Sequence, residues 1–245
     1  MDAVITPEVD RLNTEQRPLD KRDTYGKAFL QIKNLWTSSE AVREIVFSKR
    51  LARLACELMQ VSGVRLYHDQ ALYKEPGGGI TPWHADQYYW PLATEKSITL
   101  WAPLQSTPLE SGPLEFSAQS HRMTSGRHYK IGDESQQFLE EKLIQGGYRQ
   151  VTESFEPGEV SFHAGWLYHR AGVNRSRHMR KVMTVIYMDK DMKLKSPENE
   201  NQVLDWEVWC PGAVPGQIID TPLNPILYQS RISKSNKSIN NPDGH

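Results

Sequence analysis

The stretch EVSFHAGWLYHRAGVNRSRHMRKVMTVIYMD, residues 159–189, decides the expected fold of this chain. Its two ends, 159–169 and 181–189, are rich in β-branched and aromatic residues, and a polar segment with Gly and Asn joins them. Such a composition is typical of two strands separated by a turn. Similar strand patterns occur at 64–76, 97–104 and 114–118.

Helical patterns are concentrated ahead of these strands. Apolar residues recur with a period near 3.6 over 38–60, which predicts a helix capped by Ser38 or Ser39 and broken near Ser48. Residues 1–25 are polar and indicate a loosely packed lead-in. A helical front followed by many short strands predicts a mainly β fold with flanking helices (α+β), arranged as a sandwich or barrel. Because strands and helices do not alternate, a doubly wound nucleotide fold is not expected.

Length and composition bound the class of protein. The 245 residues, 38% of them hydrophobic, fit one domain, expected over 1–230, followed by a polar, flexible tail at 231–245. A net charge of -1 offers no basic excess to attract nucleic acid or anionic lipid. No run approaches the roughly 18 apolar residues that span a membrane. Cys56 and Cys210 match no disulfide framework, so we expect a cytoplasmic protein.

The segment TPWHADQYYW, residues 81–90, holds two residues that bind metals well, His84 and Asp86. On a strand, residues i and i+2 point to the same face, so both side chains are expected to aim at one point. Two histidines and one carboxylate with open positions are typical of non-haem Fe(II) oxygen chemistry. The alternative is that both are ordinary strand residues, because a lone His-X-Asp is common by chance.

Among the remaining histidines, His163 and His169 are the candidates for a third metal ligand, because both lie on a strong strand pattern. His169 ends its run just before a Gly-containing turn, where a side chain projects into a cavity mouth. His163 lies deeper and fits a supporting or structural role. Position therefore favours His169 modestly and leaves the choice open.

Arg180 begins the next strand pattern, eleven residues after His169. If the two runs form a hairpin, the arginine lies on the strand beside the metal ligand, where its guanidinium can bind a carboxylate with two hydrogen bonds. A 2-oxo acid held in this way would supply the electrons that an iron oxygenase needs. The alternative is that Arg180 belongs to the basic, solvated turn at 175–181.

Three stretches of the chain carry a family pattern over about residues 66–189. They are YKEPGGGITPWHADQYYWPL, LWAPLQSTPLESGPLEFSAQSHR and GEVSFHAGWLYHRAGVNRSRHMRKVMTVIY. Together they resemble the phytanoyl-CoA dioxygenase family of Fe(II)/2-oxoglutarate-dependent oxygenases. The resemblance implies a double-stranded β-helix, the cupin-like jelly roll, with Fe(II) as cofactor and 2-oxoglutarate and O2 as co-substrates.

The same resemblance implies roles for single residues. His84, Asp86 and His169 would be the catalytic iron ligands, and Arg180 would bind the far carboxylate of 2-oxoglutarate. Ala171 stands where a hydroxyl residue often assists this arginine, so more of the binding would rest on Arg180. The other residues expected beside 2-oxoglutarate are Trp101, Gln70 and Thr81.

The expected reaction is hydroxylation of an unactivated C–H bond, because related halogenases replace the carboxylate ligand and Asp86 is present. The expected substrate is a small-molecule metabolite, as in natural-product biosynthesis, with residues 121–150 as a lid over it. The residues expected to wall the substrate pocket are Tyr88, Tyr89, Trp90 and Trp166.

Two alternatives to this function stay open. One is a cupin-like metalloenzyme that does not use 2-oxoglutarate, and the other is a non-catalytic binding module on the same barrel. No nucleic-acid or membrane partner is expected, and the sequence carries no signal for an oligomeric state.

Overall fold

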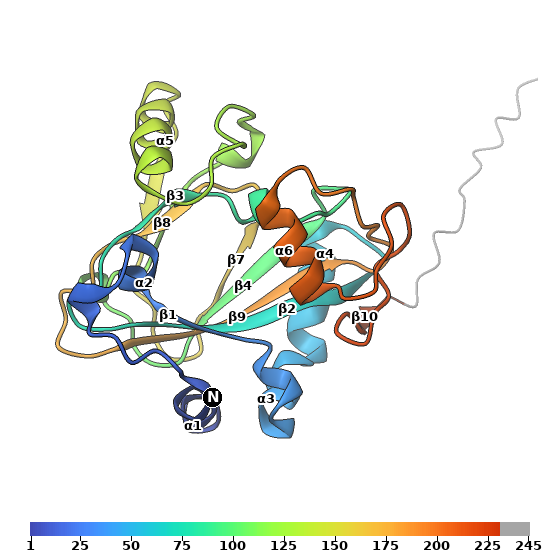
Figure 1. The fold of residues 1–245 in the computed structure, drawn as a ribbon, viewed down its shortest axis with the longest axis horizontal. Coiled ribbons are helices and arrows are strands. Elements are labelled where there is room, and N and C mark those ends of the chain that lie inside the picture. Colours follow the sequence, from blue (N-terminus) through green and yellow to red (C-terminus); the bar gives the residue numbers. More distant parts are fainter. Residues whose placement is uncertain (231–245) are drawn as a thin grey trace, which may run out of the picture.

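The computed structural model describes residues 1–230 as two antiparallel β-sheets with helices around them (Figure 1). The large sheet has the order β1 (Leu30–Lys33), β2 (Gly63–Lys74), β9 (Arg180–Asp189), β4 (Ser97–Pro103) and β7 (Ser161–Ala164), and β10 (Ile226–Gln229) also pairs with β2. The small sheet has the order β3 (Thr81–His84), β8 (His169–Ala171), β5 (Leu114–Ser117) and β6 (Gln150–Thr152). This architecture confirms the expected double-stranded β-helix with flanking helices.

Helices pack around the two sheets (Figure 1). The expected helix over 38–60 is two helices, and Ser39 and Ser48 each cap one of them by accepting a hydrogen bond from a backbone N–H of the first turn. The helices are α1 (Asp2–Leu12), α2 (Thr24–Ala28), α3 (Glu40–Val46), α4 (Lys49–Met59), α5 (Asp133–Gln145) and α6 (Glu200–Trp209). The 3₁₀ turns are η1 (Leu19–Lys21), η2 (Leu35–Thr37), η3 (Asp86–Tyr89), η4 (Leu109–Ser111) and η5 (Ser120–Arg122).

The expectation of a single strand over 159–169 is wrong, because the structure divides this segment between the two sheets. β7 pairs with β4 in the large sheet, whereas β8 pairs with β3 and β5 in the small one. The chain changes sheets at Gly165, where a Cβ atom would lie 2.4 Å from the side-chain oxygen of Gln87 and 2.6 Å from that of Ser97. Only glycine fits such a close approach.

A β-bulge in β2 decides which of its side chains face the small sheet. The pairing of β2 with β9 shifts between Leu66 and His68, so that Tyr67 is an extra residue. The bulge reverses the alternation of faces, as an inserted residue must. Leu66 therefore packs in the core beneath the large sheet, whereas His68 and Gln70 line a cavity on its other face.

The outer face of the large sheet packs against α1, α3 and α4 and forms the main hydrophobic core. The expectation of a loosely packed lead-in over 1–25 is wrong, because Ile5 and Val9 of α1 are fully buried in this core. They are four residues apart and so lie on one face of the helix. The signal is short, and the polar residues around it conceal it.

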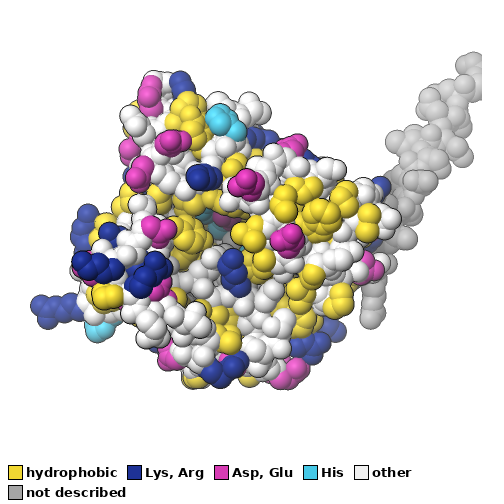
Figure 2. Space-filling view, viewed as in Figure 1, with side chains coloured by type: hydrophobic (Ala, Val, Ile, Leu, Met, Phe, Trp, Pro, Cys, Tyr) yellow, Lys and Arg dark blue, Asp and Glu magenta, His cyan; other side chains and the backbone are white. Residues whose placement is uncertain are grey.

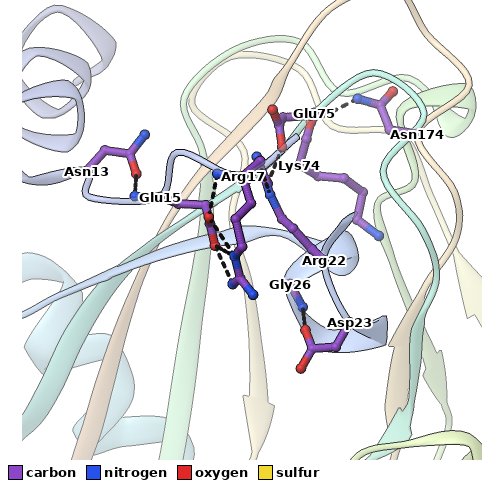
Figure 3. Close-up of polar contacts among 9 residues, drawn as sticks. All are labelled: Asn13, Glu15, Arg17, Arg22, Asp23, Gly26, Lys74, Glu75 and Asn174. Atoms are coloured by element: carbon purple, nitrogen blue, oxygen red, sulfur yellow. Dashed lines mark hydrogen bonds and ion pairs between the residues drawn. The ribbon is translucent and has the colours of Figure 1, made fainter. Parts of the chain in front are cut away.

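The segment between α1 and β1 is fastened to the end of β2 (Figure 3). Arg22 forms an ion pair with Glu75, and the side chain of Asn174 donates a hydrogen bond of 3.0 Å to the carbonyl of Lys74. The N-terminal segment and the loop after β8 therefore meet at the same end of the large sheet.

Two elements that sequence patterns did not indicate follow Asp191, namely α6 and β10. Asn199 caps α6 by accepting a hydrogen bond of 3.0 Å from the backbone N–H of Gln202. The expected tail at 231–245 lies outside the described residues. Within residues 1–230, no helix is both long and apolar enough to cross a membrane.

We expect Leu100→Ala to lower the free energy of unfolding by about 2–5 kcal/mol, because it empties space in a close-packed core. Leu100 is 1% exposed, on the outer face of the large sheet. Urea denaturation followed by circular dichroism measures the change. The matched control is Leu58→Ala on α4, where the side chain is 57% exposed and the expected change is below about 0.5 kcal/mol. Equal losses in the two variants would contradict this assignment of the core.

Candidate metal and co-substrate site

Three side chains that line one cavity direct donor atoms at one point. His84, Asp86 and His169 each offer one ligand atom, and these atoms all lie within 4.8 Å of one another. The Asp86 Oδ1 atom lies 3.6 Å from Nε2 of His84 and 3.7 Å from Nε2 of His169. Two imidazole nitrogens and one carboxylate oxygen at this spacing fit a single divalent cation with open positions.

Strand pairing brings the two histidines together. His84 of β3 lies directly opposite His169 of β8, and their ring centroids are 4.2 Å apart. The expectation that Asp86 continues the strand is wrong, because β3 ends at His84 and Asp86 begins the 3₁₀ turn η3. The change of backbone direction still turns the carboxylate toward the two rings.

Backbone hydrogen bonds set the tautomer of both histidines. Nδ1 of His84 lies 2.8 Å from the carbonyl of Pro82, and Nδ1 of His169 lies 3.0 Å from the carbonyl of Leu167. Because a carbonyl only accepts, each Nδ1 carries the proton and each Nε2 presents a lone pair. Burial lowers the pKa of His169 well below its usual value, which keeps this ring neutral. The neutral form is the one that binds a metal.

The second oxygen of Asp86 is held by two donors. The Thr99 hydroxyl donates to Oδ2 over 3.1 Å, and Nε2 of His163 lies 3.3 Å from the same atom. The Nδ1 atom of His163 is buried without a partner among the described residues, so the proton is best placed on Nε2. Burial alone would raise the pKa of Asp86, but His169 and the hydrogen bond from His163 outweigh it and hold the pKa well below its usual value. The carboxylate is thus oriented with Oδ1 toward the histidines.

Arg180 lies across the cavity from the three donors, not beside His169. The expectation that the two strands with His169 and Arg180 form a hairpin is wrong. His169 is in the small sheet, whereas Arg180 begins β9 of the large sheet. Arg180 is 2% exposed, and its Nη1 donates to the carbonyl of Gly112. Gly112 has φ +68°, and a Cβ atom there would lie 2.4 Å from the carbonyl oxygen of Gly172. This glycine is required for the loop to reach the arginine.

The end of the cavity near Arg180 carries polar groups without partners. Nε of Arg180 and Nε1 of Trp101 are both buried and have no hydrogen-bond partner within residues 1–230. The guanidinium carbon lies 5.6 Å from the centroid of the Trp101 ring. Burial lowers the pKa of Arg180 only to about 10, so the side chain stays charged at neutral pH. A buried cation and unused donors fit a carboxylate ligand.

The other two residues expected at this end also line the cavity. Thr81 is buried and its hydroxyl lies 3.4 Å from Nζ of Lys74, and Gln70 accepts a hydrogen bond from the side chain of Gln31. Lys74 itself is fully buried opposite Arg180 and donates to two backbone carbonyls. Burial and the neighbouring Arg180 lower the pKa of Lys74 to about 6.

The cavity has a volume of about 440 Å³ and reaches from Arg180 past the three donors to the surface. Figure 2 shows a hollow in the surface of the molecule, with histidine side chains at its floor. Of the four expected wall residues, Tyr89 and Trp90 line the cavity. Tyr88 and Trp166 instead line a second, neighbouring cavity. The turn η3 directs consecutive side chains to different sides, so alternation along a strand does not apply.

The outer part of the cavity has walls that sequence patterns did not indicate. Lys33 and Gln31 project from β1, two positions apart on one face of the strand. Beside them, α6 contributes Asp205 and Trp209, which are separated by about one helical turn. No motif marks α6, and its polar surroundings resemble those of a loop. From the expected lid, Lys130 and Ile131 reach the cavity.

Solved structures share this fold. The epimerase SnoN from nogalamycin biosynthesis, crystallised with Fe³⁺, α-ketoglutarate and nogalamycin RO, is 24% identical with a TM-score of 0.74, over 92% of this chain and 89% of SnoN. The α-ketoglutarate-dependent carbocyclase SnoK is 20% identical with a TM-score of 0.71, over 91% and 84%. EctD from S. alaskensis with 2-oxoglutarate and 5-hydroxyectoine is 18% identical with a TM-score of 0.64, over 90% and 77%. At these identities the similarity establishes the fold.

Sequence comparison establishes the family. No curated protein sequence matches the chain significantly. The family model for phytanoyl-CoA dioxygenase matches residues 4–182, which include most of α1, both histidines of the donor set, Asp86 and Arg180. This match spans most of the 245 residues and contains the donor set together with Arg180. The chain belongs to the phytanoyl-CoA dioxygenase family.

Proposed function

We propose that this protein is a non-haem Fe(II)/2-oxoglutarate-dependent dioxygenase that acts on a small molecule. The observation that carries the proposal is the placement of His84, Asp86 and His169 around one point, with buried Arg180 across the same cavity. Iron, 2-oxoglutarate and O2 together supply an oxidant strong enough to break an unactivated C–H bond.

Each part of the site has a distinct task in this proposal. His84, Asp86 and His169 would hold the iron and leave positions open for 2-oxoglutarate and O2. Arg180 would bind the far carboxylate of 2-oxoglutarate, with Trp101 packed beside it and Thr81 and Gln70 lining the same space. The outer part of the cavity then remains for the substrate, with Tyr89 and Trp90 in its wall.

The proposed reaction is hydroxylation of a C–H bond in a metabolite, such as an intermediate of natural-product biosynthesis. The presence of Asp86 supports it, since a halogenase of this kind leaves that coordination position to chloride. The fold also carries enzymes named as an epimerase and a carbocyclase. Mass spectrometry of the product distinguishes these outcomes, because hydroxylation adds one oxygen atom, epimerisation leaves the mass unchanged and ring closure removes two hydrogens.

We further propose that residues 1–230 form one catalytic domain that works in the cytoplasm. Two free, buried cysteines, Cys56 and Cys210, are in keeping with a reducing compartment. Residues 121–150 would cover the substrate, since Lys130 and Ile131 line the cavity and the backbone N–H of Ile131 donates to the Tyr89 hydroxyl over 2.8 Å.

Anaerobic addition of Fe(II) and then 2-oxoglutarate should produce a weak visible charge-transfer band. We expect His169→Ala to abolish the band, because the metal loses one of three protein ligands. His178→Ala is the matched control, since this histidine is exposed on the turn before β9. A protein that binds iron but shows no band would favour the cupin-like metalloenzyme without 2-oxoglutarate. Failure to bind iron at all would favour a non-catalytic binding module.

Arg180→Ala should raise the dissociation constant of 2-oxoglutarate by about 10- to 100-fold, because a buried charge-assisted hydrogen bond is lost. Iron affinity should change little, since Arg180 lies across the cavity from the ligands. Titration of the charge-transfer band measures the first quantity, and anaerobic iron titration measures the second. Arg175→Ala, on the exposed part of the same turn, is the control. Equal effects of the two substitutions would contradict the role of Arg180.

His163→Phe should raise the dissociation constant of iron by about tenfold or more, because outer hydrogen bonds orient a ligating carboxylate. Thr99→Val removes the other donor to Asp86 and should act in the same direction. Calorimetric titration with Fe(II), or with Zn(II) in air, reports the affinity without any turnover. Unchanged affinity in both variants, with thermal stability preserved, would show that the carboxylate needs neither donor.

A further inference from the structure

The outer part of the cavity differs in chemistry from the end near Arg180. Its walls are largely aromatic, and they come from separate segments of the chain. The aromatic residues are Tyr25, Phe29, Tyr89, Trp90 and Trp209. The faces of aromatic rings carry partial negative charge, so such walls favour a cation over an anion.

One carboxyl group lies within these aromatic walls. Asp205 projects from α6 into the cavity and forms no ion pair in the described part of the chain. Burial raises its pKa to about 7, and the hydrogen bond from Trp209 and the charge of Lys33 only partly oppose this. A carboxylate held in such a place without a cationic partner costs free energy, which a bound cation would recover.

Helix α6 is fixed to the segment that carries the metal ligand. The side chain of Gln202 donates to the carbonyl of Tyr88 over 3.0 Å, and that of Asn201 donates to the Tyr88 hydroxyl over 3.2 Å. Tyr88 is two residues from Asp86, on the same 3₁₀ turn. Asp205 is therefore held in a set position relative to the donor set rather than on a free loop.

Two lysines also border the cavity, and both are exposed at its mouth. Nζ of Lys33 lies 5.1 Å from the ring centroid of Trp209, and Lys130 belongs to the expected lid. Lys33 acts on Asp205 through its charge but does not form an ion pair with it among the described residues. The acid is thus not neutralised by direct contact.

We propose that the substrate carries a basic nitrogen, protonated in the bound state, which pairs with Asp205 among the aromatic rings of the outer cavity. This inference rests on the proposed function, because it places the oxidised C–H bond of an amine-bearing molecule between Asp205 and the metal ligands. In this arrangement α6 selects the substrate, and the other end of the cavity binds 2-oxoglutarate.

The pairing also gives a direction for the dependence on pH. Since the pKa of Asp205 is about 7, its charged form increases from pH 6 to pH 8, and an amine with a pKa above about 9 should bind more tightly over that interval. The other titratable or charged groups that face this part of the cavity are Tyr25, Lys33, His68, Asp86, Tyr89 and Lys130. His68 stays neutral throughout, because burial lowers its pKa to about 3.

The test uses calorimetric titration of the full chain with 2-phenylethylamine, 2-phenylethanol and phenylacetate as matched probes. We expect the amine to bind at least about tenfold more tightly than the alcohol at pH 8, and Asp205→Asn to remove that preference. Lys33→Met should leave amine binding unchanged or strengthen it, because a like charge is removed. Glu207→Gln, on the exposed side of α6, is the control and should change nothing.

The titrations are made without metal and repeated anaerobically with Fe(II) and 2-oxoglutarate. An Asp205-dependent preference for the amine in a protein that shows no charge-transfer band would overturn the proposed function and keep this inference. Three outcomes, each in a protein with a normal charge-transfer band, would overturn this inference alone. They are equal binding of the amine and the alcohol, no binding of the amine at millimolar concentration, and a preference for phenylacetate that Lys33→Met removes.

Discussion

The direct pairing of His84 with His169 across β3 and β8 is the constraint on which the rest of the site depends. It sets two imidazole rings 4.2 Å apart, and backbone carbonyls two residues earlier fix the tautomer of each. The chain then leaves the strand, and Asp86 completes the donor set from a 3₁₀ turn. A shift of one residue in this register would turn one histidine away from the cavity, because side chains alternate between the two faces of a strand.

The large sheet supplies the second half of the arrangement by forming the opposite wall. Thr99 of β4 and His163 of β7 face each other in register and both contact the same oxygen of Asp86. Farther along the same face, Trp101 and Thr184 are paired, and Arg180 lies at the end of β9. One sheet therefore orients the Asp86 carboxylate and positions the buried Arg180, while its outer face packs on α1, α3 and α4.

Charge is distributed unevenly along the cavity. The inner end holds Arg180, which is buried and stays charged at neutral pH, so it favours an anion. The outer part holds Asp205 among aromatic rings, with lysines only at the mouth. An anionic co-substrate and a cationic substrate would be directed to opposite ends of one cavity, with the donor set between them. The proposed division of labour between the β-helix and α6 follows from this polarity.

Much of this protein can be predicted from short patterns in its sequence. Such patterns alone indicate the strands at 64–76 and 97–104, the broken helix over 38–60, and the candidate residues His84, Asp86, His169 and Arg180. The order and spacing of those same residues also indicate the family, and the family model matches residues 4–182. Sequence-based predictions fail where the local pattern is ambiguous. In α1 only a few positions are apolar. In the run 159–169, residues typical of strands lie both before and after the point where the chain passes from one sheet to the other.

What the sequence by itself determined is therefore the fold class and the candidate residues of the inner site, because strand patterns and the spacing of residues within a motif are local properties. Only the tertiary structure decided that Arg180 faces the donor set from the opposite sheet, that His163 and Thr99 hold one oxygen of Asp86, and that α6 closes the outer cavity. The hydrogen bond of Gln202 with Tyr88, which fixes α6 to η3, joins segments more than a hundred residues apart. Such contacts depend on packing, and the side chains of β2 that line the cavity depend on a β-bulge; neither leaves a periodic signal in the chain.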